Sequence, residues 1–178
     1  RVYLRAVADK GGKWRKLGAG YDGGVSADFW SKDAATIYFN DGIRATTQLI
    51  ALDVQKDVVR QITREKAALS VSRDEDTGVV LINYSDGATP PTLFTSPSIE
   101  AVGTRASWRQ LTDANPQVRQ FALGAQEEFT WTSKDGTKVG GVLVKPVGYQ
   151  PGQRYPLIVA IHGGPAAADV LRFNGGYG

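Results

Sequence analysis

A short stretch near the end of the chain has the residue types of a catalytic turn. An unbroken apolar run, Leu157–Ile161, leads directly into His162, Gly163, Gly164 and Pro165. Glycine frees the backbone to adopt conformations that other residues avoid, and it leaves the backbone N–H groups uncovered. Bare N–H donors at the edge of a site can stabilise the oxyanion that forms during acyl transfer. The His162–Pro165 turn is therefore the candidate site of this chain.

Such a turn needs a strand to deliver it. Five consecutive apolar residues, bounded by Pro156 and the glycines, predict a strand that is buried on both faces, as in a parallel sheet. Before it, alternation over Glu128–Thr132, a Lys134–Thr137 turn and a returning run at Val139–Val144 predict a β-hairpin. A hairpin that leads into a fully apolar strand is typical of the edge of an α/β sheet.

The first two thirds of the chain have a different pattern, which repeats with a period of about 45 residues. Leu4, Leu49 and Leu93 each lie in a short extended segment, and two further series of similar segments follow with nearly the same spacing. A period of this length that is filled by about four short strands is typical of a β-propeller blade. Each blade is a small antiparallel sheet that must stack on its neighbours to cover its faces.

The predicted organisation is mostly β, with the last blades of a β-propeller followed by the first strands of an α/β-hydrolase domain. Residues 1–114 would form the propeller part and residues 115–178 the truncated start of a catalytic domain, with the boundary at Asn115-Pro116. An Asn40-Asp41-Gly42 turn is expected within the first full blade. The predicted blades are a partial one at 1–20 and two full ones at 26–66 and 67–114. The strands expected in the first full blade are Ala27–Trp30, Thr36–Asn40, Gln48–Leu52 and Val58–Thr63. Those expected in the second are Ala68–Ser72, Val79–Tyr84, Thr92–Thr95 and Arg105–Leu111.

Composition excludes some function classes and leaves others open. The formal net charge is +3, with 21 basic and 18 acidic residues scattered along the chain, so we expect no nucleic-acid partner. No apolar run approaches the ~20 residues that cross a bilayer, and we expect no membrane partner. The absence of cysteine and the single histidine argue against a metal site, and no cofactor is expected. The compartment stays open between cytoplasmic and periplasmic or secreted.

The chain resembles the prolyl oligopeptidase family of serine peptidases, most closely its acylaminoacyl-peptidase and dipeptidyl-peptidase-like branches. The resemblance lies in the succession of blade repeats, an Asn-Pro hinge, a hairpin and then Tyr155–Pro165. The resemblance implies a propeller that caps an α/β-hydrolase domain and admits peptide or acyl-peptide substrates. It implies hydrolysis of peptide bonds in short peptides through an acyl-enzyme, formed by a Ser-His-Asp triad. In that scheme the Gly164 N–H would be a donor to the oxyanion.

The sequence departs from the family pattern at the triad. It contains no Gly-x-Ser-x-Gly nucleophile elbow, and its only histidine, His162, lies on the oxyanion turn and does not match the catalytic base. None of the triad is therefore assigned to this chain. Because the chain has no Met and opens inside the strand-like Val2–Leu4, we expect it to be an internal section of a longer protein and to be inactive alone. Open sheet edges recruit partners, which leaves a homo-oligomer open.

Two other function classes compete with the peptidase. The chain could be a propeller interaction module without catalysis, or part of a capped α/β-hydrolase esterase. Structural roles are also expected for most of the polar clusters. Glu127-Glu128 is expected to be a solvated strand start, and Ser31-Lys32-Asp33 and Ser72-Arg73-Asp74 are expected to be turn and strand-end residues. Trp14, Trp30, Trp108 and Trp131 are expected in the blade and hairpin cores.

Overall fold

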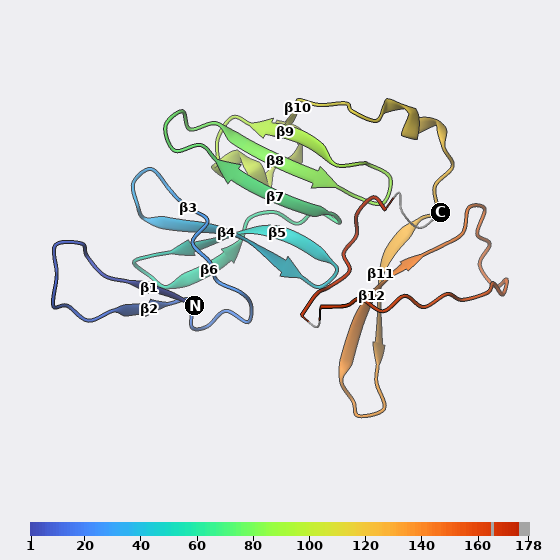
Figure 1. The fold of residues 1–178 in the computed structure, drawn as a ribbon, viewed down its shortest axis with the longest axis horizontal. Helices are drawn as coiled ribbons and strands as arrows, with labels where there is room; N and C mark the ends of the chain where they lie inside the picture. The colour runs from blue at the N-terminus through green and yellow to red at the C-terminus, as the bar shows by residue number, and fades with distance from the viewer. Residues whose placement is uncertain (165, 175–178) are drawn as a thin grey trace.

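The computed structural model describes residues 1–164 and 166–174, and it consists mostly of antiparallel β-strands (Figure 1). Its main features are two four-stranded sheets, with strand orders β3-β4-β5-β6 and β10-β9-β8-β7. Two smaller pairs, β1-β2 and β11-β12, flank them. The strands are β1 (Val2–Leu4), β2 (Arg15–Leu17), β3 (Phe29–Trp30), β4 (Thr36–Ile43), β5 (Thr46–Asp53), β6 (Val58–Gln61), β7 (Ala68–Arg73), β8 (Val80–Ser85), β9 (Thr92–Ser96), β10 (Arg109–Gln110), β11 (Gln126–Thr132) and β12 (Lys138–Val144). Three short 3₁₀ helices are η1 (Glu100–Gly103), η2 (Arg105–Ser107) and η3 (Pro116–Gln120).

The strands predicted for the two full repeats correspond closely to those of the four-stranded sheets. In each sheet, strands that follow one another along the chain pair antiparallel, as their short connections require. The last predicted strand is shorter than expected, because Arg105–Ser107 forms η2 and only Arg109–Gln110 pairs with β9. The β1-β2 pair likewise forms where the partial repeat is expected.

The expected turn at Asn40-Asp41-Gly42 is wrong. These residues belong to β4, where Asn40 pairs with Leu49, Asp41 with Gln48 and Gly42 with Thr47. The chain turns instead at Arg44-Ala45, and Arg44 adopts a left-handed conformation with φ of 53°. Asn and Asp are frequent in turns because their side chains bond locally. Here those side chains bond to distant segments, so the local preference does not decide the conformation.

The β3–β6 sheet is buried on both faces. Tyr38, Leu49 and Ala51 belong to a core shared with Leu69, Val71 and Ile82 of the next sheet. The other face of the sheet contributes to a second core, through Ile37, Phe39, Ile50 and Leu52. Leu17 and Val25 complete this core, and the partly buried Val2 and Leu4 of β1 pack against it. Successive residues of a strand point to opposite faces, so one apolar sheet supplies both cores.

The far face of the β7–β10 sheet is more polar and is exposed. Ser70, Ser72 and Asn83 lie on this face, together with Leu81 and Leu93. These two leucines are 37% and 38% exposed. Among the described residues, no other sheet packs against this face.

Two of the four tryptophans lie outside the cores. Trp108 packs against the first core and Trp30 against the second, as expected. Trp14 is 59% exposed beside the Arg5 guanidinium, and Trp131 is 45% exposed and stacked on Phe129. Both lie on two-stranded hairpins, which offer one layer and no second sheet to bury a large ring.

The predicted buried strand at Leu157–Ile161 does not form in this structure. These residues are assigned to no strand, and Leu157, Ile158, Val159 and Ile161 are between 71% and 90% exposed. A parallel strand gains its hydrogen bonds and its burial from neighbouring strands. No described segment pairs with this run, so its apolar side chains stay in contact with solvent.

Candidate functional site

The His162–Gly164 part of the candidate turn lies within the described residues, whereas Pro165 lies outside them. Gly164 has a φ of 126°, a conformation that side chains with a Cβ rarely adopt. An added Cβ there would approach the Cβ of Ala167 to 3.1 Å, while one at Gly163 would meet no atom within 4 Å. The conformation of Gly164 therefore favours glycine, and an added side chain would also crowd Ala167.

The backbone N–H groups of this turn are free to donate. Among the described residues, neither the N–H of Gly163 nor that of Gly164 donates to a protein acceptor. The turn is exposed, as is the extended run before it. An oxyanion site needs such donors fixed in a water-excluded pocket. The described residues supply the donors, but they do not enclose them.

Among the described residues, the His162 ring has one hydrogen-bond contact, with its own neighbour. Its Nδ1 lies 3.1 Å from the carbonyl oxygen of Gly163, and the imidazole is exposed. No serine hydroxyl or carboxylate bonds to it within the described part of the chain. A catalytic base needs a nucleophile within hydrogen-bond reach, and this geometry gives His162 no such partner.

Glu127 and Glu128 are adjacent in β11 but point to different partners. The Glu127 carboxylate accepts a hydrogen bond from Lys145 Nζ at 2.7 Å, which raises the pKa of Lys145. The Glu128 carboxylate lies 3.8 Å from an Arg44 guanidinium nitrogen, at the turn between β4 and β5. The two carboxylates therefore do not form a paired site. Glu127 fastens the base of the hairpin, and Glu128 faces the β3–β6 sheet.

The two Ser-basic-Asp clusters lie at a turn and at a strand end, as expected, since Lys32 and Asp33 are turn residues and Ser72 and Arg73 end β7. Asp33 accepts hydrogen bonds from the Ser31 hydroxyl at 2.6 Å and from the N–H of Ala35 at 3.1 Å, and these bonds lower its pKa. The hydroxyl and the N–H of Thr77 both donate to Asp74 and lower its pKa in the same way. Each carboxylate is therefore used to close a loop next to a strand.

A shallow cleft of about 280 Å³ lies between the β8–β9 loop and η3. Arg105 lines it, and the guanidinium carbon lies 4.3–4.5 Å from the ring centres of Tyr84, Phe94 and Trp108. The other arginine of the cleft, Arg119, is paired with both oxygens of Asp113. The cleft contains none of the residues of the glycine turn.

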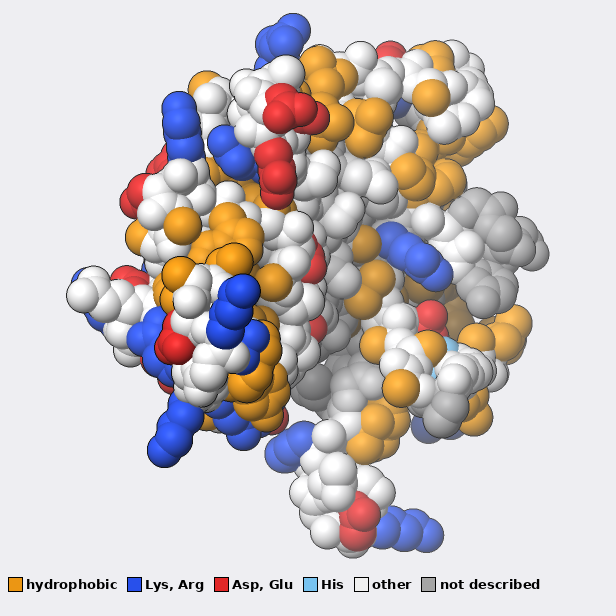
Figure 2. All heavy atoms as spheres, turned by 60° about the vertical axis from the view of Figure 1, so that its left-hand side comes forward, with side chains coloured by type: hydrophobic (Ala, Val, Ile, Leu, Met, Phe, Trp, Pro, Cys, Tyr) orange, Lys and Arg blue, Asp and Glu red, His pale blue; other side chains and the backbone are white. Residues whose placement is uncertain are grey.

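Two searches of the described residues concern metal-ligand clusters and membrane-spanning helices. Within residues 1–164 and 166–174, no group of three or more His, Asp or Glu residues could hold a metal ion. The helices of this part are all too short to cross a bilayer. On the face seen in Figure 2, Lys and Arg side chains lie scattered among Asp and Glu.

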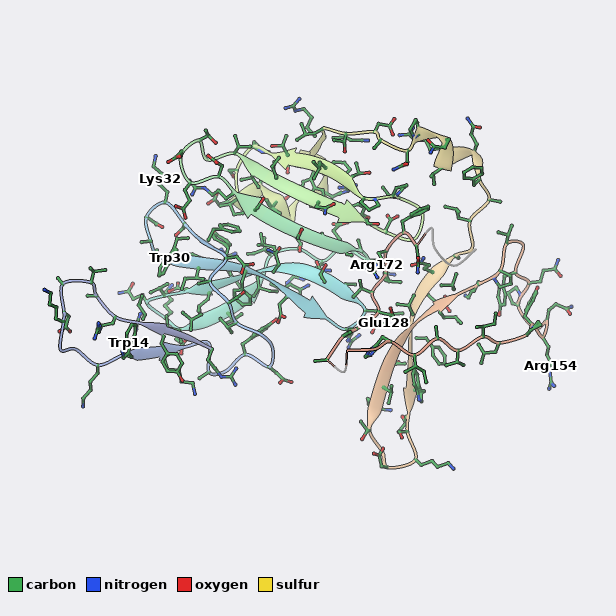
Figure 3. The ribbon with its side chains drawn as sticks, in the orientation of Figure 1. Trp14, Trp30, Lys32, Glu128, Arg154 and Arg172 are labelled. Atoms are coloured by element: carbon green, nitrogen blue, oxygen red, sulfur yellow. The ribbon has the colours of Figure 1, made fainter. Side chains whose placement is uncertain are left out.

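The structure also shows an arrangement that the sequence pattern did not predict. Leu171, Arg172 and Phe173, which follow the glycine turn, lie against the ends of the two large sheets. In Figure 3, Arg172 and Glu128 are labelled in the region between these sheets and the β11–β12 hairpin. Nothing in the periodicity of this short segment indicates a contact with residues that are 46 to 126 positions away.

Comparison with known proteins gives peptidases as relatives. The chain is 29% identical over 147 residues to the uncharacterized peptidase YuxL of Bacillus subtilis, and this match covers 80% of the chain. It is 26% identical over 162 residues to dipeptidyl-peptidase 5 of Trichophyton schoenleinii, with 85% of the chain covered. The chain spans about a fifth of the length of these curated relatives, 21% in both cases. No family model matches.

Solved structures with a similar fold are also peptidases. The AtxE2 isopeptidase, in a variant with astexin-3 bound, superposes with a TM-score of 0.59 at 21% identity over 81% of this chain. The acylaminoacyl peptidase of Pyrococcus horikoshii superposes with a TM-score of 0.57 at 23% identity over 78% of this chain. The chain spans 21% and 20% of those two structures. At this level of identity the likeness concerns the fold.

Proposed function

This chain is related in sequence to the peptidases of the prolyl oligopeptidase family, and on that premise we propose that it is a section of a serine peptidase of that family. The observation that carries the proposal is that named peptidases match most of the chain, including both the repeats and the segment that follows them. The proposed reaction is hydrolysis of peptide bonds in peptide or acyl-peptide substrates through an acyl-enzyme.

The two four-stranded sheets support the assignment of residues 1–114 to propeller blades. Each sheet is an antiparallel meander, and the sheets stack through a shared core that includes Leu49, Leu69 and Ile82. The β1-β2 pair covers the opposite face of the β3–β6 sheet, where the outer strands of a preceding blade would lie. In a complete propeller, another blade or domain would cover the exposed Leu81 and Leu93.

Residues 115–178 are proposed to begin the α/β-hydrolase domain. The β11-β12 hairpin would form its edge, and Leu157–Ile161 would become a buried strand once parallel neighbours are present. This addition would bury four of the large apolar side chains that are now exposed. The His162–Pro165 turn would then lie at the end of the strand, with the free N–H of Gly164 as oxyanion donor.

The chain alone is proposed to be inactive, because its sequence has no nucleophile elbow and its only histidine has no serine partner among the described residues. The test is labelling with a fluorophosphonate probe, which reacts with activated serines. The 178-residue chain is expected to stay unlabelled, and a longer polypeptide that adds a Gly-x-Ser-x-Gly segment is expected to be labelled. Labelling of the short chain, or failure of the longer one, would refute the proposal.

The oxyanion role has its own test in the longer polypeptide. Gly164→Ala keeps the backbone N–H but strains the conformation that aims it, so it is expected to lower kcat by up to roughly 10²–10³-fold, the effect of losing one oxyanion donor, with little change in KM. Gly152→Ala is the matched control, because Gly152 also has positive φ, 85°, but has no atom within 4 Å of an added Cβ. Equal losses for both variants would mean that backbone strain, and not the donor, causes the effect.

A further inference from the structure

The chain contacts the large sheets at Leu171, seven residues after Gly164, and Leu171 is buried there. Leu171 is only 5% exposed, in contrast to the apolar run before the turn. Its N–H donates to the carbonyl oxygen of Ala45 at 2.8 Å, at the turn between β4 and β5. Ala45 is also 5% exposed, so this hydrogen bond is shielded from water.

The next two residues add hydrogen bonds to two other elements. The carbonyl oxygen of Arg172 accepts a hydrogen bond from Gln126 Nε2 at 3.0 Å, at the start of β11. The N–H of Phe173 donates to the Ser85 hydroxyl at 3.0 Å, at the end of β8. Three consecutive residues, Leu171–Phe173, are therefore bonded to both large sheets and to the hairpin. We call this segment the strap.

The strap limits where the glycine turn can go. Gly164 precedes Leu171 by seven residues, and an extended chain spans at most about 3.3–3.6 Å per residue. The turn is thus held within roughly 25 Å of the ends of β4, β5 and β8. On its other side the turn follows the exposed run Leu157–Ile161, which provides no anchor of its own.

We propose that Leu171 is a positioning residue, and that the strap ties the glycine turn to the ends of the two stacked sheets. The docking partner is this chain itself, through Ala45, Ser85 and Gln126. The catalytic meaning of this contact rests on the proposed function, because the place of the turn matters for catalysis only if the turn supplies an oxyanion donor. The docking itself depends on the contacts and not on any activity.

Docking is tested by amide hydrogen exchange in the 178-residue chain. Leu171→Asp places a charge in a buried position and is expected to release the strap. The amides at positions 171 and 173 should then exchange at least about tenfold faster than in the unsubstituted chain. Leu171→Met keeps an apolar side chain of similar volume and is expected to retain protection. Protection of β4, β5 and β8 should be unchanged in both variants.

Two results would overturn docking as a local anchor. Unchanged exchange at Leu171 and Phe173 in Leu171→Asp would mean that no strap exists. Faster exchange throughout β4–β9 would mean that Leu171 supports the core and does not position the turn. Ser85→Ala gives an independent check, because it removes the acceptor of the Phe173 N–H together with the hydroxyl's own bond to the Thr89 carbonyl oxygen, and it should speed exchange at Phe173 more than in β8.

Positioning is tested in the longer, fluorophosphonate-reactive polypeptide. Leu171→Asp is expected to lower kcat by at least about tenfold with KM nearly unchanged, because a released strap no longer keeps the oxyanion donor near the reacting carbonyl. Leu171→Met, the conservative variant, is expected to keep the kcat of the unsubstituted polypeptide. An unchanged kcat together with faster strap exchange would refute positioning while docking stands. Absence of labelling in the unsubstituted polypeptide would refute the proposed function and leave the exchange result intact.

Discussion

The carboxamide of Asn40 in β4 makes both of the hydrogen bonds that a neighbouring strand would make to Val71 in β7. Asn40 Oδ1 accepts from the Val71 N–H at 2.7 Å, and Asn40 Nδ2 donates to the Val71 carbonyl oxygen at 3.0 Å. Thr47 repeats the arrangement one step along, since its hydroxyl bonds to both the N–H and the carbonyl oxygen of Leu69. Side chains of one sheet therefore complete the edge strand of the next.

Asn40→Ala is expected to destabilise the chain by roughly 2–4 kcal/mol, because it leaves the buried N–H and carbonyl oxygen of Val71 without partners. Urea unfolding followed by circular dichroism measures the change. Asn83→Ala is the matched control, because Asn83 also lies in a strand but is exposed and has no side-chain hydrogen bond among the described residues. A similar loss in both variants would show that the bridge to Val71 contributes nothing specific.

Tyr21 is predicted to ionise late. Burial raises its pKa to about 12, and its hydrogen bond to Asp41, 2.8 Å long, adds to the effect. A pKa that is raised in the folded state adds stability below the unfolded value of 10.0, and this stability is lost as the pH rises from there toward 12. The difference in absorbance at about 295 nm between the chain and its Tyr21→Phe variant isolates this titration among the seven tyrosines.

Asp41→Asn distinguishes the two causes of this shift. Removing the carboxylate should lower the pKa of Tyr21 only in part, because burial is the larger cause. A return to the ordinary value of 10.0 would mean that Asp41 accounts for the whole shift. An unchanged titration would mean that the hydrogen bond does not act on Tyr21 at all.

Gly124 is required by the close approach of two backbones at the base of the β11-β12 hairpin. A Cβ at this position would lie 2.0 Å from the carbonyl oxygen of Lys145, whose N–H bonds to Ala125. Gly124→Ala must therefore separate the two strand ends, and we expect a loss of roughly 1–3 kcal/mol, as for overpacking. Faster amide exchange at Lys145 and a lower urea midpoint would report it.

Gly140→Ala is the control for Gly124, because Gly140 lies in β12 and an added Cβ there meets no atom within 4 Å. We expect this change to be neutral or to stabilise by up to about 1 kcal/mol, since alanine restricts the unfolded chain. If the two alanine variants unfolded at the same urea concentration, the result would contradict a requirement for glycine at position 124.

The sequence predicts the strands well because their determinants are local. The alternation at Val71 and Ile82 follows from the pleat and is visible in a window of a few residues. The repeated phase of Leu49 and Leu93 follows from sheet stacking and is visible when segments about 45 residues apart are compared. The sheet pairing follows in turn, since short connections favour antiparallel neighbours.

The errors occur where distant residues decide the outcome. Asn40 and Asp41 have turn propensity, yet their side chains bond to Val71 and Tyr21, and β4 continues through them. Leu157–Ile161 has the composition of a buried strand, but a strand needs partners that the described residues do not supply. For the candidate site, residue types indicate the glycine turn as an oxyanion site, which stays a prediction. The contact of Leu171 with Ala45 depends on distant residues that no local pattern encodes.

Thr63 completes a buried polar cluster within the β3–β6 sheet. Thr63 and Gln48 are each only 1% exposed. The Thr63 hydroxyl accepts from the N–H of Leu49 at 2.9 Å and donates to Gln48 Oε1 at 2.7 Å. The Gln48 carboxamide in turn bonds to the backbone N–H and carbonyl oxygen of Glu65. Each hydrogen bond of the cluster is made either by the Thr63 hydroxyl or by the Gln48 carboxamide to which it is bonded.

Thr63→Val keeps the shape of the side chain and removes its hydroxyl, so the N–H of Leu49 loses its side-chain acceptor inside the sheet. We expect a loss of about 1–3 kcal/mol, the cost of an unsatisfied buried group, measured by urea unfolding. Thr130→Val in β11 is the matched control, because Thr130 is exposed and should change stability by less than about 0.5 kcal/mol. Equal midpoints for the two valine variants would show that the cluster is not what stabilises this part of the sheet.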